Sequence, residues 1–124
     1  MSPRSDELLD RAREGVASAR DQLAAVHAET AISTAYYATL YAARAALSER
    51  DLTARTHAGT WHLFDEAFVA TGAFDRELAR RARAAQARRE ASDYAAERLE
   101  LSEAEELVEV ARRFVDAVAR MLEA

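Results

Sequence analysis

Apolar residues recur at steps of three and four through almost the whole 124-residue chain, and this spacing is the period of an α-helix. The residues that build turns are scarce, because the chain holds only three Gly and one Pro. A β-sheet or an α/β domain needs many more turns than these residues supply. The sequence therefore predicts an all-α protein.

The apolar spacing divides the chain into five expected helices with short connections between them. They cover about residues 5–27, 29–50, 56–69, 75–98 and 102–122. Ser5 is placed to cap the first helix, and Thr71-Gly72 ends the third. Short connections make successive helices run antiparallel. We expect one domain over residues 1–124, an up-and-down antiparallel helical bundle with the short third helix laid across it.

Composition excludes several classes of protein. The absence of Cys rules out disulfides, Cys-ligated zinc and a thiol nucleophile. The three His residues have no acidic neighbours spaced as in a zinc-binding helix, so we expect no metal site and no cofactor. No apolar run approaches the roughly 18 residues of a membrane span, and the N-terminus has no signal-peptide core. We expect a cytoplasmic protein with no membrane partner.

One segment is strongly basic although the net charge of the chain is −5. All 17 basic residues are Arg, and six of them fall within residues 76–89. One interpretation is a solvated face that forms salt bridges with the acidic start of the next helix. The other is a surface that binds phosphate or RNA. In that case the phosphate-binding residues would be Arg55, Arg80, Arg81 and Arg88.

A tyrosine pair and one histidine allow both a structural and a functional interpretation. Tyr37 and Tyr41 lie four residues apart on one helix face, where they either pack in the core or stack on a base. His57 stands at a helix N-terminus, where the helix dipole favours the neutral ring. It either packs beneath a neighbour while Thr56 caps the helix, or takes a proton from a ribose 2′-OH.

Four short features occur in an order that resembles the HEPN superfamily, the higher eukaryotes and prokaryotes nucleotide-binding domain. They are Ala35-Tyr36-Tyr37-Ala38, Arg55-Thr56-His57-Ala58-Gly59, the pair Phe64 and Phe68, and Arg89-x-x-x-Asp93-Tyr94. The resemblance covers about residues 5–122. It implies an all-α bundle that forms a homodimer, with the Arg-bearing helix at the dimer cleft.

The resemblance also implies a function. Many HEPN proteins are metal-independent ribonucleases, often toxins, paired with a small nucleotidyltransferase antitoxin that can add adenylate to a tyrosine. Their signature is an Arg with a His a few residues further on, and here Asp93-Tyr94 stands in place of that His. The implied catalytic residues are Arg89 as phosphate binder, His57 as base, Asp93 to orient Arg89, and Tyr94 as phosphate contact or adenylate acceptor.

Two other functions stay open. The bundle could be a non-catalytic module that dimerises and docks the nucleotidyltransferase. It could also be a structural helical protein without a ligand, in which case the acidic last helix would neutralise the basic face.

Overall fold

The computed structural model describes residues 1–95 and 100–124, with side chains for residues 1–91 and 100–124. Those residues form α-helices and one π-helical turn and no β-strand, so the all-α prediction is confirmed. The elements are α1 (Pro3–Ala24), α2 (Ala28–Ser48), α3 (His57–Phe64), the π-helical turn η1 (Asp65–Val69), α4 (Arg76–Ala95) and α5 (Leu101–Glu123). None of the helices in the described part of the chain has both the length and the apolar character needed to cross a bilayer.

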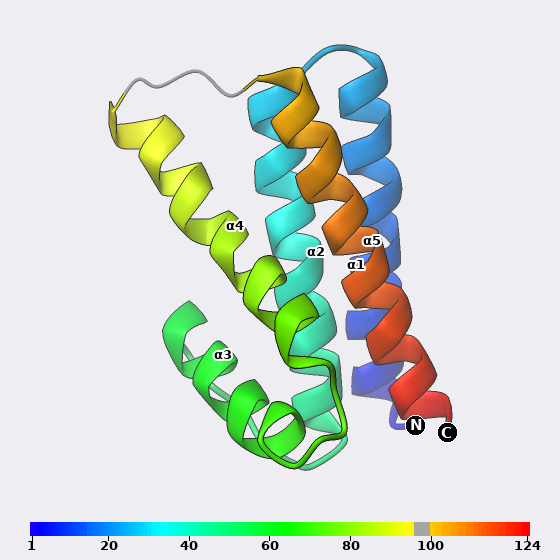
Figure 1. The fold of residues 1–124 in the computed structure, drawn as a ribbon. Coiled ribbons are helices and arrows are strands. Elements are labelled where there is room, and N and C mark those ends of the chain that lie inside the picture. The colour runs from blue at the N-terminus through cyan, green and yellow to red at the C-terminus, as the bar shows by residue number, and fades with distance from the viewer. Residues whose placement is uncertain (96–99) are drawn as a thin grey trace.

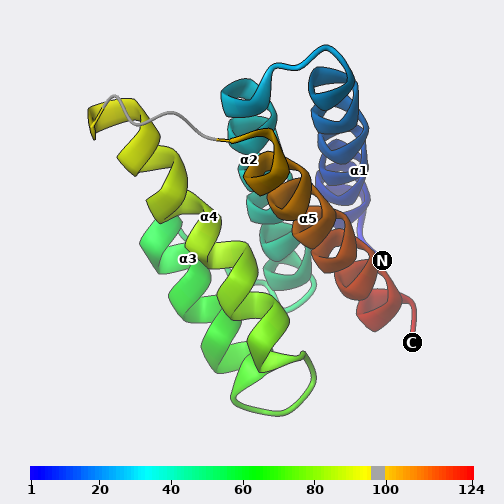
Figure 2. The same cartoon turned by 45° about the horizontal axis from the view of Figure 1, so that its top comes forward.

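The helices pack around α2 (Figure 1). Helices α1 and α5 lie against one side of α2, and the two chain termini meet at the same end of the bundle. Helix α3 and the lower part of α4 lie on the other side of α2 (Figure 2). The late part of α4 diverges from the bundle axis in both views. The short third helix thus sits beside the bundle and brings its first residue, His57, toward α2 and α4.

Small residues allow α1 and α2 to approach closely. Ala38 and Ala42 of α2 are almost fully buried, as the Ala-rich face of this segment predicts. A Cβ atom at Gly15 would lie 3.0 Å from the Cβ of Ala38, so only Gly fits at this point of α1 without displacing α2. This packing fixes which face of α2 remains for α3 and α4.

An aromatic cluster joins α3 to the rest of the core. Phe64 packs edge-on against Phe74 with ring centroids 5.1 Å apart, and Phe114 of α5 lies 5.6 Å from Trp61. All four rings are buried. Aromatic pairs in these tilted and edge-on arrangements are favourable beyond the area they bury. The cluster therefore holds α3 in one orientation between α5 and the start of α4.

The start of α1 differs from the sequence prediction. Ser2 caps the helix, because its hydroxyl accepts from the Ser5 backbone N–H at 3.1 Å. Ser5 is fully buried, and its Oγ donates to Glu49 at 2.8 Å. The Ser2 backbone N–H also donates to Glu49, at 3.1 Å, and these bonds hold the pKa of the Glu49 carboxyl below its usual value. Glu49 thereby ties the first turn of α1 to the end of α2.

Candidate functional site

The Thr56-His57-x-Gly59 motif builds the N-terminus of α3. The Thr56 hydroxyl accepts from the Gly59 backbone N–H at 2.9 Å, which confirms Thr56 as the cap. A Cβ atom at position 59 would lie 2.8 Å from the Thr56 hydroxyl oxygen, so Gly leaves room for the cap. The cap makes His57 the first residue of the helix and sets the direction of its ring.

The His57 ring meets two tyrosines of α2. Its centroid lies 5.7 Å from the Tyr36 ring and 5.7 Å from the Tyr37 ring. Its Nδ1 atom lies 3.3 Å from the Tyr36 hydroxyl oxygen. Tyr36 is fully buried, whereas His57 and Tyr37 are partly exposed. The buried phenol therefore anchors a ring that solvent and ligands can reach.

Hydrogen bonds around the Tyr36 hydroxyl decide the His57 tautomer. Glu90 accepts from the Gln86 amide nitrogen at 3.1 Å, which turns the amide oxygen of Gln86 toward Tyr36. Tyr36 gives its one proton to that oxygen at 3.0 Å, and its own oxygen accepts from the indole N–H of Trp61 at 3.2 Å. The phenol has no second proton, so Nδ1 of His57 must be the donor to Tyr36. The neutral ring then keeps Nε2 as its acceptor.

Charges around His57 favour this neutral ring. Partial burial lowers the His57 pKa from its ordinary 6.5, the positive charges of Arg44 and Arg89 lower it further, and Glu90 opposes them. Burial raises the pKa of the Tyr36 phenol, which stays protonated and able to donate. At neutral pH the site therefore presents an uncharged imidazole beside positive charge.

Arg89 of α4 completes this arrangement. Its guanidinium carbon lies 5.3 Å from the centroid of the Tyr37 ring, within the range of a cation–π contact. Tyr37 in turn meets His57 edge-on. Three helices thus bring one aromatic ring, one neutral imidazole and one arginine to the same place. A neutral imidazole can act as a general base, and an arginine beside it can stabilise negative charge on a phosphate.

The comparison with known proteins agrees with this architecture. The profile of the HEPN domain matches residues 5–121. The chain belongs to the HEPN family. A similar protein is UPF0332 protein glr0978 of Gloeobacter violaceus, 33% identical over 94 residues, which are 76% of this chain and 75% of that protein. The match to the HEPN profile includes every residue of the candidate site.

Not all the expected site residues of this HEPN chain gather at His57. Tyr37 and Arg89 do, whereas Tyr41 lies under Arg11 of α1, whose guanidinium carbon is 5.9 Å from the ring centroid. Arg55 is exposed just before α3 and lines a separate pocket. The side chains of the other two expected residues, Asp93 and Tyr94, lie outside the described ones.

Most of the basic face of α4 is paired with carboxylates. Four ion pairs have N–O distances between 2.6 and 2.9 Å, namely Arg80–Glu77, Arg81–Glu106, Arg83–Asp65 and Arg88–Glu103. Two of these carboxylates belong to α5, so the acidic last helix does meet the basic one. Exposed pairs of this kind add little stability. They do mean that Arg80, Arg81 and Arg88, expected to bind phosphate, have carboxylate partners in this HEPN chain.

Sequence reasoning overlooked the residues that support His57. Trp61 and Gln86 fix its tautomer through Tyr36, and Arg44 adds positive charge. The double tyrosine and the lone tryptophan were visible signals. Nothing in the sequence singles out Gln86, because its part depends on how α4 crosses α2 in the HEPN fold.

Proposed function

We propose that this HEPN protein is a metal-independent endoribonuclease of the toxin type, paired with a small nucleotidyltransferase antitoxin. One observation carries the proposal. Arg89, Tyr37 and His57 converge from three helices, and the hydrogen bonds of Tyr36 leave Nε2 of His57 as the acceptor. In the described part of the chain, Nε2 has no hydrogen-bond partner of its own.

The residues suggest one order of events. Nε2 of His57 takes the proton of a ribose 2′-OH, and the 2′-oxygen attacks the adjacent phosphorus. The bond from phosphorus to the 5′-oxygen breaks, and that oxygen takes a proton from water. The products are a 2′,3′-cyclic phosphate and a 5′-hydroxyl. Arg89 stabilises the extra negative charge on the phosphate in the transition state, and Tyr37 stacks on a base.

Other residues have roles by resemblance to the family. Asp93 orients Arg89, and Tyr94 contacts phosphate or accepts adenylate from the nucleotidyltransferase. Arg55 contacts a more distant phosphate, and Tyr41 offers a second stacking surface. Three expected phosphate ligands already pair with carboxylates, namely Arg80, Arg81 and Arg88. To bind RNA, each of them exchanges its carboxylate partner for a phosphate.

The proposal includes a homodimer. HEPN domains often dimerise, and the proposed cleft lies along α4, the helix that bears Arg89. A second copy there would place two Arg89 side chains along one bound RNA. Sedimentation analysis of the purified chain tests for the dimer. A monomer at all concentrations would contradict the proposed homodimer.

Growth after induced expression tests the proposal in cells. We expect arrest with the wild-type chain, loss of arrest with Arg89→Ala, and full arrest with Arg76→Ala, which removes an exposed arginine outside the site. Circular dichroism checks that both variants are folded. If Arg89→Ala is as toxic as the wild-type chain, the site is wrongly assigned.

A second candidate function is a non-catalytic module that docks the nucleotidyltransferase. The ion pairs of α4 favour it, because they present a face of mixed charge rather than one of uniform positive potential. A stable stoichiometric complex with the nucleotidyltransferase, combined with no RNA cleavage by the chain alone, would select this function.

A further inference from the structure

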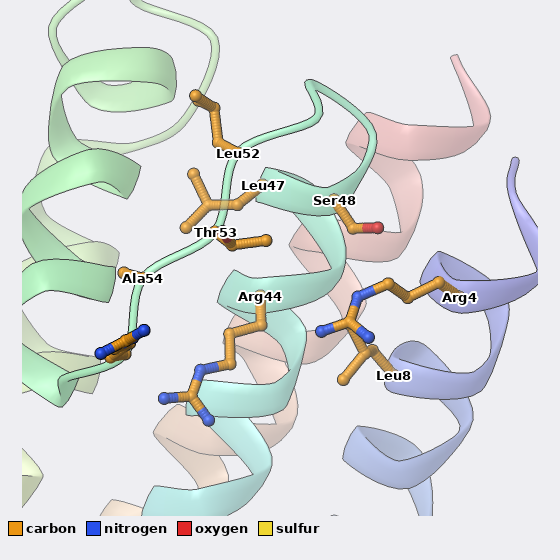
Figure 3. Close-up of a pocket in the computed structure, with 9 residues that line it drawn as sticks. Arg4, Leu8, Arg44, Leu47, Ser48, Leu52, Thr53 and Ala54 are labelled. Atoms are coloured by element: carbon orange, nitrogen blue, oxygen red, sulfur yellow. The ribbon is translucent and has the colours of Figure 1, made fainter.

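A pocket of about 260 Å³ opens at the end of the bundle where α1 begins and α2 ends. Figure 3 shows Arg4 reaching from α1 toward α2, and Arg44 extending from α2 toward the segment that carries Thr53 and Ala54. The first turns of α1, the end of α2 and the segment that follows α2 therefore contribute to one hollow. Its other lining residues are Leu8, Leu47, Ser48, Leu52 and Arg55.

The charged residues that line this pocket are all arginines. Arg4, Arg44 and Arg55 line it, and no Asp or Glu does. In the described part of the chain none of these three arginines forms an ion pair, in contrast to the arginines of α4. Like charges that converge without a counter-charge repel one another. A bound anion would relieve that repulsion.

The three arginines stand on a rigid frame. Glu49 accepts hydrogen bonds from the Ser2 backbone N–H and the Ser5 hydroxyl, and so holds the first turn of α1, which carries Arg4. The Leu52 backbone N–H donates to Leu47 at 2.9 Å, which closes the turn after α2. Arg44 donates from Nε to the Thr60 hydroxyl at 3.4 Å, and its two terminal nitrogens make no hydrogen bond within the described residues. The backbone that carries the three arginines is thus held in place before any ligand arrives, and Arg44 is held by its side chain as well.

We propose that this pocket binds a phosphate group through Arg4, Arg44 and Arg55. Guanidinium groups bind phosphate oxygens with paired N–H donors, and the pocket has room for one such group. Arg55 stands two residues before His57, and the charge of Arg44 reaches the His57 ring. The inference deepens the proposed function, since it assigns a second phosphate contact beside the catalytic centre. It does not require that the protein cleave RNA.

Titration with inorganic phosphate, followed by backbone amide NMR, tests the pocket directly. We expect saturable shifts concentrated at Ser48 and residues 52–55. Arg4→Gln/Arg55→Gln should weaken binding about tenfold or more, because it removes two charge-assisted contacts. Both side chains are exposed and make no hydrogen bond within the described residues, so the variant should fold normally. Arg76→Gln/Arg120→Gln removes the same charge from exposed positions elsewhere and should bind as the wild type does.

Two results would overturn the proposal. One is equal phosphate affinity in the wild type and in Arg4→Gln/Arg55→Gln. The other is a set of shifts spread over the arginines of α4 rather than concentrated at the pocket. Either result would mean that phosphate binds the positively charged surface without preference for the pocket.

A second titration identifies the source of the phosphate group. A single-stranded 2′-O-methyl uridine oligomer has no 2′-OH nucleophile, so it reports binding without cleavage. If it displaces inorganic phosphate from the pocket, the site binds the RNA backbone. If phosphate binds and the oligomer leaves the pocket amides unchanged, the site binds a small phosphate compound. Either result supports the pocket, and absence of RNA cleavage alongside phosphate binding would refute the proposed nuclease only.

Discussion

The Nδ1 atom of His57 lies 3.3 Å from the hydroxyl oxygen of Tyr36, and this contact decides which ring nitrogen can act as a base. Tyr36 gives its own proton to Gln86, so it can only accept from His57. The result is a neutral imidazole with Nε2 as its acceptor. The hydrogen bond made by one ring nitrogen of a functional histidine commonly sets the protonation of the other in this way.

The tautomer is measurable by ¹⁵N NMR of the His57 ring. We expect Nδ1 to be protonated and Nε2 unprotonated above the His57 pKa. Tyr36→Phe removes the acceptor and leaves the Trp61 N–H without its partner, so it should mix the tautomers and cost about 1–3 kcal/mol of unfolding free energy. A wild-type ring protonated at Nε2 would remove His57 as the base.

The stability of the protein should depend on His57 as the pH falls from about 6.5 toward the range in which carboxyl groups titrate. Burial and the charges of Arg44 and Arg89 lower the His57 pKa in the fold, so the unfolded chain takes up the proton first as the pH falls. The unfolding free energy should therefore decrease as the pH drops below 6.5, the ordinary pKa of the group. Carboxyl groups, with ordinary values near 4.5, contribute mainly below that window.

Chemical denaturation across this pH range checks the effect. His57→Gln, which cannot titrate, should show a shallower decrease than the wild type. Equal slopes for the two proteins would mean that His57 does not carry the pH dependence.

Removing Arg89 should raise the His57 pKa. Arg89→Gln deletes a positive charge that disfavours the imidazolium, and Arg44→Gln should act in the same direction. Arg76→Gln, which deletes an exposed charge that is not among the groups shifting His57, should leave it unchanged. NMR titration of the imidazole proton measures all three. An unchanged His57 pKa in Arg89→Gln would mean that Arg89 does not lie near His57 in solution.

The role of Gly59 predicts a coupled pair of substitutions. Thr56→Ala should cost about 1 kcal/mol of unfolding free energy because it removes the cap. Ala favours a helix more than Gly does, so Gly59→Ala should raise the unfolding free energy by up to about 1 kcal/mol when the Thr56 hydroxyl is absent. When that hydroxyl is present, the new Cβ would displace it. With Thr56 present, the gain in helix propensity and the loss of the cap should nearly cancel, so Gly59→Ala alone should change the unfolding free energy little. A double-mutant cycle by denaturation measures the coupling, and strict additivity would contradict the close contact.

Helical periodicity was sufficient to predict the fold. The five expected helices exist, and small residues such as Gly15 and Ala38 let α1 and α2 pack closely. The cap of α1 was assigned to Ser5 instead of Ser2, because both residues have a hydroxyl that can accept near the first turn. Only the structure shows that Glu49 draws Ser5 inward. The π-helical turn after Phe64 likewise has no periodic signal in so short a segment.

The candidate site was predicted in part. The motifs identified Tyr37, His57 and Arg89, which meet in space. Tyr41 shares a helix face with Tyr37, yet one turn further along α2 its neighbour is Arg11 of α1 rather than His57 and Arg89. The supporting contacts of Gln86 depend on the crossing of α2 and α4, and no local pattern encodes that crossing. The pairs Arg81–Glu106, Arg83–Asp65 and Arg88–Glu103 likewise join residues far apart in the sequence, whereas Arg80–Glu77 lies within one turn of α4.

Cleavage of single-stranded RNA by the purified chain in the presence of a chelator tests the central claim most directly. We predict products that end in a 2′,3′-cyclic phosphate and a 5′-hydroxyl. His57→Gln and Arg89→Gln should each lower the rate about 100-fold or more, whereas Arg76→Gln should keep the wild-type rate. A wild-type chain that cleaves no RNA, or cleavage that persists in His57→Gln, would contradict the account.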